Sequence, residues 1–362
     1  MANNNNFKKI LVVILMIVAG LTLTACTPLT LSSPSEEAGV FKSFDYVEKW
    51  EHKNFAGLKG KKKLSLGAVE TKEIILDPND HAFVYLATRN SWLFVSENAG
   101  EEWRSIYADG SVIDLALDAK SRGVVYMALG NKILKTIDQG KNWQQLYLET
   151  RPEVALTQIV LDPQENTKMI MANSQGEILI STDAGESWKL AFEAKNSVRR
   201  VLINPKNNKI IYAVTLMGAI FRSADGGKNW VNLREKYESF GGGIYRYRFL
   251  AFDPSVADGL FYVSDYGIIR TQDGGNNWQA LKLLTPPEAV IINIMAVNAK
   301  DAQQIYYATA NTIYRTFDGG KTWLSAKAPT GKAPSYLLID AETANVVYMG
   351  VVTVESKPFF LL

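Results

Sequence analysis

One eight-residue motif recurs six times in this chain of 362 residues, and it limits the possible folds more than any other feature. The motif reads Ser/Thr-x-Asp-x-Gly-x-x-Trp, with Asn in place of Asp in the first copy. Its third position is held by Asn98, Asp138, Asp183, Asp225, Asp273 and Asp318. Its last position holds six of the eight tryptophans, Trp103, Trp143, Trp188, Trp230, Trp278 and Trp323. Regular recurrence of this kind indicates stacked repeats, each burying its apolar face against its neighbours.

Two further elements recur seven times at the same spacing. An apolar run of the type VYLAT carries Tyr or Ile at its second position, and 263 residues separate the first, Tyr85, from the last, Tyr348. These six intervals average about 44 residues. Each run follows an apolar strand that ends in Asp or Asn, at Asp77, Asp118, Asp162, Asn204, Asp253, Asn298 and Asp340. Short strands separated by turn residues, about four per repeat, predict an all-β, seven-bladed β-propeller.

The seventh repeat lacks the motif and the tryptophan strand. It keeps two strands, over 335–340 and 346–352, and would leave a sheet edge open. The segment 44–55, which contains Tyr46 and Trp50, is available to supply the missing outer strand. We therefore predict a ring that is closed by N- and C-terminal strands, in a single propeller over residues 44–362.

The N-terminal segment has the features of a bacterial lipoprotein signal. Lys8 and Lys9 precede a largely apolar stretch over 10–23, shorter than the about 20 apolar residues of a membrane span. The end of the stretch, Leu-Thr-Ala-Cys26, resembles the lipobox, in which cleavage leaves the cysteine as a diacylated N-terminus. This predicts a signal peptide over 1–25, a lipidated N-terminus with a flexible tether over 26–43, and an extracytoplasmic protein anchored in the bacterial cell envelope. The alternatives are a plain signal peptide with an incidental cysteine and a tilted membrane helix.

Composition excludes several kinds of chemistry. Cys26 is the one cysteine, and His52 and His81 are the only histidines, which excludes a Cys/His zinc site and an internal disulfide framework. Removal of residues 1–25 removes two lysines and no acid, leaving 37 basic and 37 acidic side chains. The net charge of the mature chain therefore gives no support for a nucleic acid as partner. We expect a monomer without metal or cofactor.

The repeats resemble those of the Asp-box, or BNR-repeat, propellers. That group includes sialidases, sortilin-type receptors, xyloglucan hydrolases and the photosystem II stability and assembly factor, and the resemblance covers about residues 68–352. It implies that the boxes are structural and lie on the periphery of the ring, away from the ligand face. The Asp carboxylate and the Ser/Thr hydroxyl can hydrogen-bond backbone N–H groups in a tight hairpin whose glycine has a positive φ. Metal binding by the boxes is the alternative, but the ligand spacing of an EF-hand is absent.

A lipobox joined to a single propeller favours the assembly-factor-like lipoproteins. This implies a scaffold that binds a protein partner at or in the membrane, without chemistry of its own. The Arg-Ile-Pro motif of sialidases is absent here, and a xyloglucan hydrolase of this group uses two facing propellers. The alternative is a propeller that binds or hydrolyses carbohydrate, because a glycosidase needs two carboxylates across a cleft, which Glu73 and Asp114 could supply with Arg200 nearby.

Polar side chains gather where the first strands of the repeats begin. Four positions before the terminal Asp or Asn lie Glu73, Asp114, Gln158, Arg200, Phe249, Ile294 and Tyr336. One position earlier lie Lys72, Ile113, Thr157, Arg199, Arg248, Asn293 and Ser335. Because propeller blades begin at the centre of the ring, we expect these residues around one mouth of the channel. The alternative is that they are solvated strand ends.

Two other segments are candidate contact surfaces. The longest interval between boxes, from Trp230 to Trp278, contains three glycines followed by Ile-Tyr245-Arg246-Tyr-Arg248, and Tyr and Arg are enriched in interface hot spots. The photosystem II assembly factor is associated with an arginine patch that contacts its partner, and Arg199, Arg200, Arg246 and Arg248 could form an analogue. A variable surface loop is the alternative. The lysine-rich run over 59–63 could touch anionic lipid, with a solvated loop as the alternative.

Overall fold

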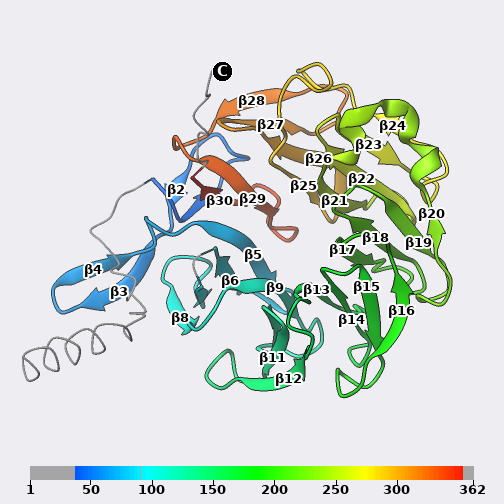
Figure 1. The fold of residues 1–362 in the computed structure, drawn as a ribbon. Helices are drawn as coiled ribbons and strands as arrows, with labels where there is room; N and C mark the ends of the chain where they lie inside the picture. Colours follow the sequence, from blue (N-terminus) through cyan, green and yellow to red (C-terminus); the bar gives the residue numbers. More distant parts are fainter. Residues whose placement is uncertain (1–36, 90, 354–362) are drawn as a thin grey trace, which may run out of the picture. The chain divides into compact units, whose positions relative to one another are not determined.

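The computed structural model describes residues 37–89 and 91–353. Over these residues the chain forms β-strands and three short 3-10 helices. The strands make seven four-stranded antiparallel sheets, arranged as the blades of a ring, and one separate two-stranded hairpin (Figure 1). Within the described part of the chain, no helix is long and apolar enough to cross a membrane. The prediction of an all-β, seven-bladed propeller is confirmed.

The blades, which we name A to G, follow one another along the chain. Blade A contains β5 (Thr71–Asp77), β6 (Asp80–Thr88), β7 (Leu93–Ser96) and β8 (Arg104–Tyr107), and blade B contains β9 (Val112–Leu117), β10 (Val125–Leu129), β11 (Lys132–Thr136) and β12 (Gln144–Leu148). Blade C contains β13 (Leu156–Leu161), β14 (Met169–Asn173), β15 (Glu177–Ser181) and β16 (Lys189–Glu193), and blade D contains β17 (Val198–Ile203), β18 (Ile211–Thr215), β19 (Ile220–Ser223) and β20 (Val231–Asn232).

Blades E to G complete the ring. Blade E contains β21 (Tyr247–Asp253), β22 (Gly259–Ser264), β23 (Gly267–Thr271) and β24 (Gln279–Ala280), and blade F contains β25 (Ile294–Asn298), β26 (Asp301–Ala308), β27 (Thr312–Thr316) and β28 (Leu324–Lys327). Blade G contains β29 (Ala333–Ile339), β30 (Val347–Val352), β1 (Val40–Ser43) and β2 (Glu51–His52). The separate hairpin is β3 (Phe55–Lys59) with β4 (Lys62–Ser65).

Turn chemistry at the end of each inner strand is the same in all seven blades. The side-chain oxygen of the terminal Asp or Asn accepts a hydrogen bond from the backbone N–H two residues later, as in Asp77 with Asn79 at 2.8 Å and Asp340 with Glu342 at 2.9 Å. This turn sends the chain back into the second strand. Second strands such as β10 and β22 are buried along their whole length, because each sheet is covered on both faces by its neighbours.

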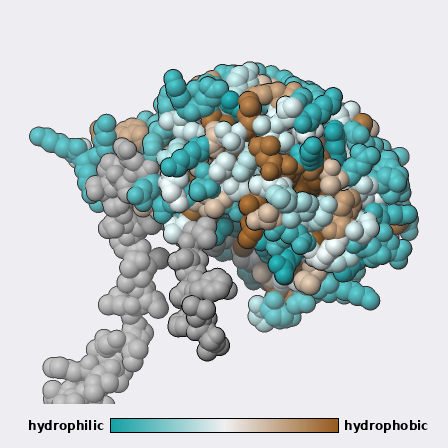
Figure 2. All heavy atoms as spheres, turned by 90° about the horizontal axis from the view of Figure 1, so that it is seen from above, coloured by the Kyte–Doolittle hydropathy of each residue, from teal (hydrophilic) through white to brown (hydrophobic). Residues whose placement is uncertain are grey.

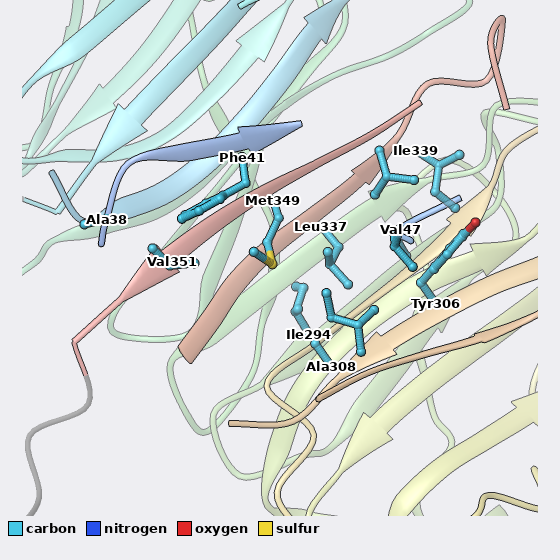
Figure 3. Close-up of a cluster of buried hydrophobic side chains, with 13 residues drawn as sticks. Ala38, Phe41, Val47, Ile294, Tyr306, Ala308, Leu337, Ile339, Met349 and Val351 are labelled. Atoms are coloured by element: carbon cyan, nitrogen blue, oxygen red, sulfur yellow. The ribbon is translucent and has the colours of Figure 1, made fainter. Parts of the chain in front are cut away.

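The N-terminal strands close the ring, as predicted. Val40 to Ser43 in β1 pair with β30, and β2 pairs with β1, so the last blade takes two strands from each end of the chain. Phe41 and Val47 are buried in one apolar cluster with Ile294 of blade F and Met349 of blade G (Figure 3). The predicted segment 44–55 supplies the outer strand, β2, and the structure adds a second strand, β1, that the sequence analysis did not predict. Two strands are supplied, and the first begins at Val40, inside the range assigned to the tether.

A seventh box connects β1 to β2, and the sequence motif did not reveal it. In the segment from Ser43 to Trp50, Ser, Asp and Trp have the spacing of the other six boxes, but Val47 stands where they have glycine. Ser43 Oγ donates to Asp45 Oδ1 at 2.9 Å, and Asp45 Oδ1 accepts from the backbone N–H of Lys49 at 2.9 Å. Tyr46 and Val47 have φ values of 61° and 68°, in the left-handed region where a β-branched residue is strained.

Candidate functional site at the channel mouth

The first residues of the inner strands surround a cavity of about 490 Å³ at one mouth of the channel. A second hollow, of about 430 Å³, extends along the inner strands toward the opposite face. Four residues line both spaces, namely Glu73, Asp114, Arg200 and Tyr336. The structure thus brings together the acid pair and one arginine that the sequence analysis singled out. Both acids are buried, with 8% of each residue exposed.

β-Bulges explain why two adjacent residues of each inner strand reach the mouth. In blade A, Thr71 pairs with Thr88 and Glu73 pairs with Ala87, so Lys72 has no partner on β6. Corresponding shifts lie at Ile113, Thr157, Arg199, Arg248 and Ser335 in blades B, C, D, E and G. A bulge re-aims side chains that would otherwise alternate between the faces of a strand. Lys72 and Arg199 accordingly line the cavity beside Glu73 and Arg200.

Side chains on consecutive inner strands reach the backbone of the neighbouring blade along the wall of the channel. Asp114 Oδ2 accepts a hydrogen bond from the backbone N–H of Ile159 at 3.0 Å, and the backbone N–H of Leu115 lies near Glu73 and helps to lower its pKa. Gln158 continues the series by accepting from the N–H of Val201. Asp114 and Gln158 therefore each satisfy a backbone donor of the next blade. Asp114 thus has a structural role beside any chemical one.

Burial disfavours the charge of both carboxyls. It raises the pKa of Glu73, and it raises the pKa of Asp114 well above its ordinary value, with the nearby charge of Glu73 as the next cause. Arg200 and Lys72 oppose these shifts by lowering both pKa values. The O–H of Tyr336 also donates to Glu73 Oε1, at 3.4 Å. Burial raises the pKa of Tyr247, on the same cavity, to about 12.

Arg200 holds the next position in this series, on blade D, and its side chain carries N–H donors and no acceptor oxygen. Its Nε atom is buried and has no hydrogen-bond partner among the described residues. Its guanidinium carbon lies 5.9 Å from the ring centroid of Phe249, the equivalent position on blade E. None of the ion pairs within 4 Å in the described ranges involves Arg200, although Glu73 and Asp114 line the same cavity. A half-buried arginine with an unpaired buried donor is a site for an incoming acceptor.

The Tyr-Arg segment of blade E lies beside this cavity in a different environment. Three short 3-10 helices, η1 (Arg234–Lys236), η2 (Glu238–Phe240) and η3 (Gly242–Tyr245), precede it, with Tyr237 and Ile244 fully buried. The ring of Tyr245 lies 4.1 Å below the guanidinium of Arg234. Asp265 pairs with both arginines of the segment, with Arg246 at 3.4 Å and with Arg248 at 2.7 Å. Arg199 and Arg200, but not Arg246 and Arg248, line the cavity.

All six predicted boxes have the hydrogen bonds of a structural turn. Asp225 Oδ1, for example, accepts from Ser223 Oγ at 2.9 Å and from the backbone N–H of Asn229 at 2.9 Å. These bonds lower the pKa values of Asp138, Asp183 and Asp225 to about 2, with the Asn142, Ser187 and Asn229 bonds as the largest causes. Asn98 uses its amide oxygen in the same way, accepting from Ser96 Oγ and from the N–H of Glu102 at 2.9 Å each.

Cys26, the predicted lipidation site, lies outside the described residues. Within 37–89 and 91–353, no group of three or more His, Cys, Asp and Glu side chains is placed to hold a metal ion.

The seven blades and their box turns define an Asp-box β-propeller, which confirms the expected resemblance. A family model described as "Photosynthesis system II assembly factor YCF48" matches residues 95–247. The matched range runs from blade A to the first residue of blade E and contains Asp114, Arg199, Arg200 and Tyr247. No curated protein matches the chain.

Solved structures of two kinds are similar to this one. A YCF48 bound to a D1 peptide has 17% identity and a TM-score of 0.62, over 80% of this chain and 94% of that one. YCF48 from Cyanidioschyzon merolae has 15% identity and a TM-score of 0.61, over 78% and 95%. A GH74 xyloglucanase from Xanthomonas campestris has 13% identity and a TM-score of 0.62, over 78% of this chain but 51% of the enzyme. At these identities the likenesses show the shared fold.

Proposed function

We propose that this protein is a lipid-anchored, extracytoplasmic scaffold that binds a segment of a protein partner at the channel mouth. The observation that carries the proposal is Arg200, a half-buried residue whose buried Nε has no hydrogen-bond acceptor and which lines a cavity of about 490 Å³. Tyr247 and Tyr336 line the same cavity, and Arg and Tyr dominate the energetics of protein interfaces. Backbone carbonyls or a carboxylate of a bound polypeptide would satisfy the donors of Arg200.

Other features of the mouth support an acceptor-rich ligand. Lys72 and Arg199 line the cavity as further donors, and burial raises the pKa values of Glu73 and Asp114 while it lowers that of Lys72. The similar YCF48 that is bound to a D1 peptide supports a peptide as ligand. An assembly factor that holds a partner segment during construction of a membrane complex would need a site of this kind. Retention near that partner would come from the diacyl group on Cys26, for which two buried acyl chains are enough.

The second candidate is a propeller that hydrolyses carbohydrate. It is favoured by Glu73 and Asp114, two carboxyls with raised pKa values on one cavity, and by the GH74 fold. Against it, Asp114 accepts a backbone hydrogen bond from the next blade and Glu73 accepts one from the O–H of Tyr336, which gives both carboxyls a role in a propeller of this sequence. We therefore assign the acids to structure and Arg200 to ligand binding.

Parallel assays separate the two functions. Tagged wild-type protein and three variants, Arg200→Gln, Arg104→Gln and the pair Glu73→Gln with Asp114→Asn, are tested for partner capture from membranes and for release of reducing sugar from polysaccharides. Arg104 is the matched control, because it lies on the outer strand β8 and pairs with Glu97. The scaffold proposal expects capture to be lost in Arg200→Gln alone. Sugar release by the wild type that disappears in the amide pair would establish the hydrolase.

The anchor is tested separately. Cys26→Ser should move the protein from the membrane fraction to the soluble fraction. A serine variant that stays in the membrane pellet after a high-salt wash would contradict lipid anchoring.

A further inference from the structure

The hairpin of β3 and β4 belongs to no blade and carries a concentrated positive charge. It leaves the ring between blades G and A (Figure 1), and hydrophilic side chains project at the same left edge in Figure 2. Lys59, Lys61, Lys62 and Lys63 at its end are all exposed. None of their ammonium groups has a hydrogen-bond or ion-pair partner among the described residues. Leu58, beside them, is 64% exposed.

The hairpin pairs like charges across its strands. Lys59 lies directly opposite Lys62, and Leu58 lies opposite Lys63, around a turn in which Gly60 has a φ of 63°. Like charges directly opposite each other destabilise an antiparallel pair. This repulsion matters in a two-stranded hairpin, because an isolated hairpin of two strands is only marginally stable in water. An external anion would relieve this repulsion.

The base of the hairpin is tied to the start of the ring. The backbone N–H of Ala38 donates to Gly67 O and that of Gly39 donates to Val69 O, each at 3.0 Å. Asn54, just before β3, donates from Nδ2 to Ala38 O at 3.0 Å. The chain from Cys26 to residue 37 spans eleven residue steps and at most about 40 Å. A lipid anchor at Cys26 therefore keeps this corner of the ring within about 40 Å of the bilayer.

We propose that the β3–β4 hairpin is a membrane-contact element that binds the phosphate groups of anionic phospholipids. Its lysines supply the attraction to the headgroups, and Leu58 supplies an apolar side chain at the interface. This contact would fix the face that the anchored ring presents to the membrane. The inference rests on the proposed anchoring at Cys26 for its geometry, but binding of the hairpin lysines to anionic lipid can be measured separately from the anchor.

The experiment places a fluorophore on the hairpin of the full-length, acylated protein. In Lys61→Cys the new thiol is the one free thiol, because acylation occupies Cys26, the single native cysteine. The labelled protein is reconstituted into vesicles of phosphatidylcholine, with or without phosphatidylglycerol, that carry an energy acceptor on a headgroup. The test variant adds Lys59→Gln, Lys62→Gln and Lys63→Gln. The matched control instead adds Lys189→Gln, Lys195→Gln and Lys228→Gln, three exposed lysines on blades C and D.

Energy transfer should be higher with phosphatidylglycerol than without it, because docking brings the hairpin closer to the headgroups than the anchor alone does. Each lysine contributes roughly fivefold to the ratio of docked to undocked hairpin, so the test variant should lose most of this increase and the control should keep it. High salt should have the same effect as the test variant. Equal transfer in both kinds of vesicle, or no loss in the test variant, would overturn the proposal.

Flotation of the vesicles separates this proposal from the anchor. Flotation of the protein with pure phosphatidylcholine reports the acyl anchor alone. If the protein does not float there, the anchor proposal fails, and the hairpin proposal then requires flotation with phosphatidylglycerol vesicles that depends on the three lysines. Absence of that dependence would overturn the hairpin proposal.

Discussion

Asp114 on blade B accepts a hydrogen bond of 3.0 Å from the backbone N–H of Ile159 on blade C. Ile159 is buried, with 1% of the residue exposed. The carboxyl that a catalytic interpretation would treat as an acid or base therefore has a structural task that does not require a negative charge. An amide oxygen could accept the same hydrogen bond.

Asparagine at position 114 should preserve the fold, whereas alanine should not. Asp114→Ala leaves the N–H of Ile159 unpaired and should lower the free energy of unfolding by about 1–3 kcal/mol, while Asp114→Asn should change it by less than about 1 kcal/mol. Urea denaturation of the two variants at one pH makes the comparison. Equal losses in both variants would show that the charge, and not the acceptor, is required.

Stability should depend on pH through the acid pair. Burial raises the pKa values of Glu73 and Asp114 in the folded state, so the native protein binds more protons than the unfolded chain above the unfolded pKa values. Their contribution is fully present below the unfolded pKa values, and it is lost as pH rises through the raised folded values. Glu73→Gln with Asp114→Asn removes this loss, so the double variant should gain stability relative to the wild type as pH rises above the unfolded pKa values.

Denaturation series for both proteins across this pH range measure the difference. A difference that stays constant with pH, or that falls as pH rises, would contradict the direction of the two pKa shifts.

Asp225→Ala should destabilise the fold without affecting ligand binding. The variant loses the acceptor for Ser223 Oγ and for the N–H of Asn229, and the melting temperature should fall by a few degrees. Asp225→Asn is the matched control, because Asn98 holds the equivalent turn in the first box. An unchanged melting temperature with a large loss of partner affinity would instead make the box a binding site.

Asp225 should also contribute to acid resistance. Its pKa is lowered to about 2 in the fold, so its contribution is present above its unfolded pKa and is lost as pH falls toward 2. The asparagine variant should therefore show a weaker loss of stability on acidification than the wild type.

Glycine should be tolerated better at position 47 than at an equally buried strand position. Val47 is fully buried at a φ of 68°, and the left-handed conformation costs a non-glycine residue about 1–2 kcal/mol. Relief of that strain offsets part of the packing lost in Val47→Gly. Val347→Gly removes an equally buried valine of the same cluster from strand β30, with no such relief. The free energy of unfolding should be at least about 1 kcal/mol higher for Val47→Gly than for Val347→Gly. A lower value for Val47→Gly would contradict the strain at this position.

The repeat pattern predicted the ring, because each blade repeats the same local turn chemistry. It missed the seventh box, since Val47 replaces the glycine by which the motif was recognised, although Ser43, Asp45 and Trp50 keep its spacing. The shared cavity of Glu73, Asp114 and Arg200 followed from strand position alone.

Other features of the site depend on tertiary pairing. No sequence period marks the bulges that turn Lys72 and Arg199 toward the mouth, because a bulge is a mismatch between two strands. Asp265 comes from a different hairpin than Arg246 and Arg248, so their pairing could not be predicted from the Tyr-Arg segment.

Site-specific photo-crosslinking in intact cells tests the central claim most directly. A photoreactive residue replaces Ile113, which lines the cavity beside Asp114, and a second variant carries it at Lys228 on the periphery of blade D. The account predicts a crosslinked polypeptide from position 113 that disappears when Arg200→Gln is added, and no such product from position 228. A product from position 113 that survives Arg200→Gln, or a partner crosslinked at position 228 alone, would contradict a peptide site at the channel mouth.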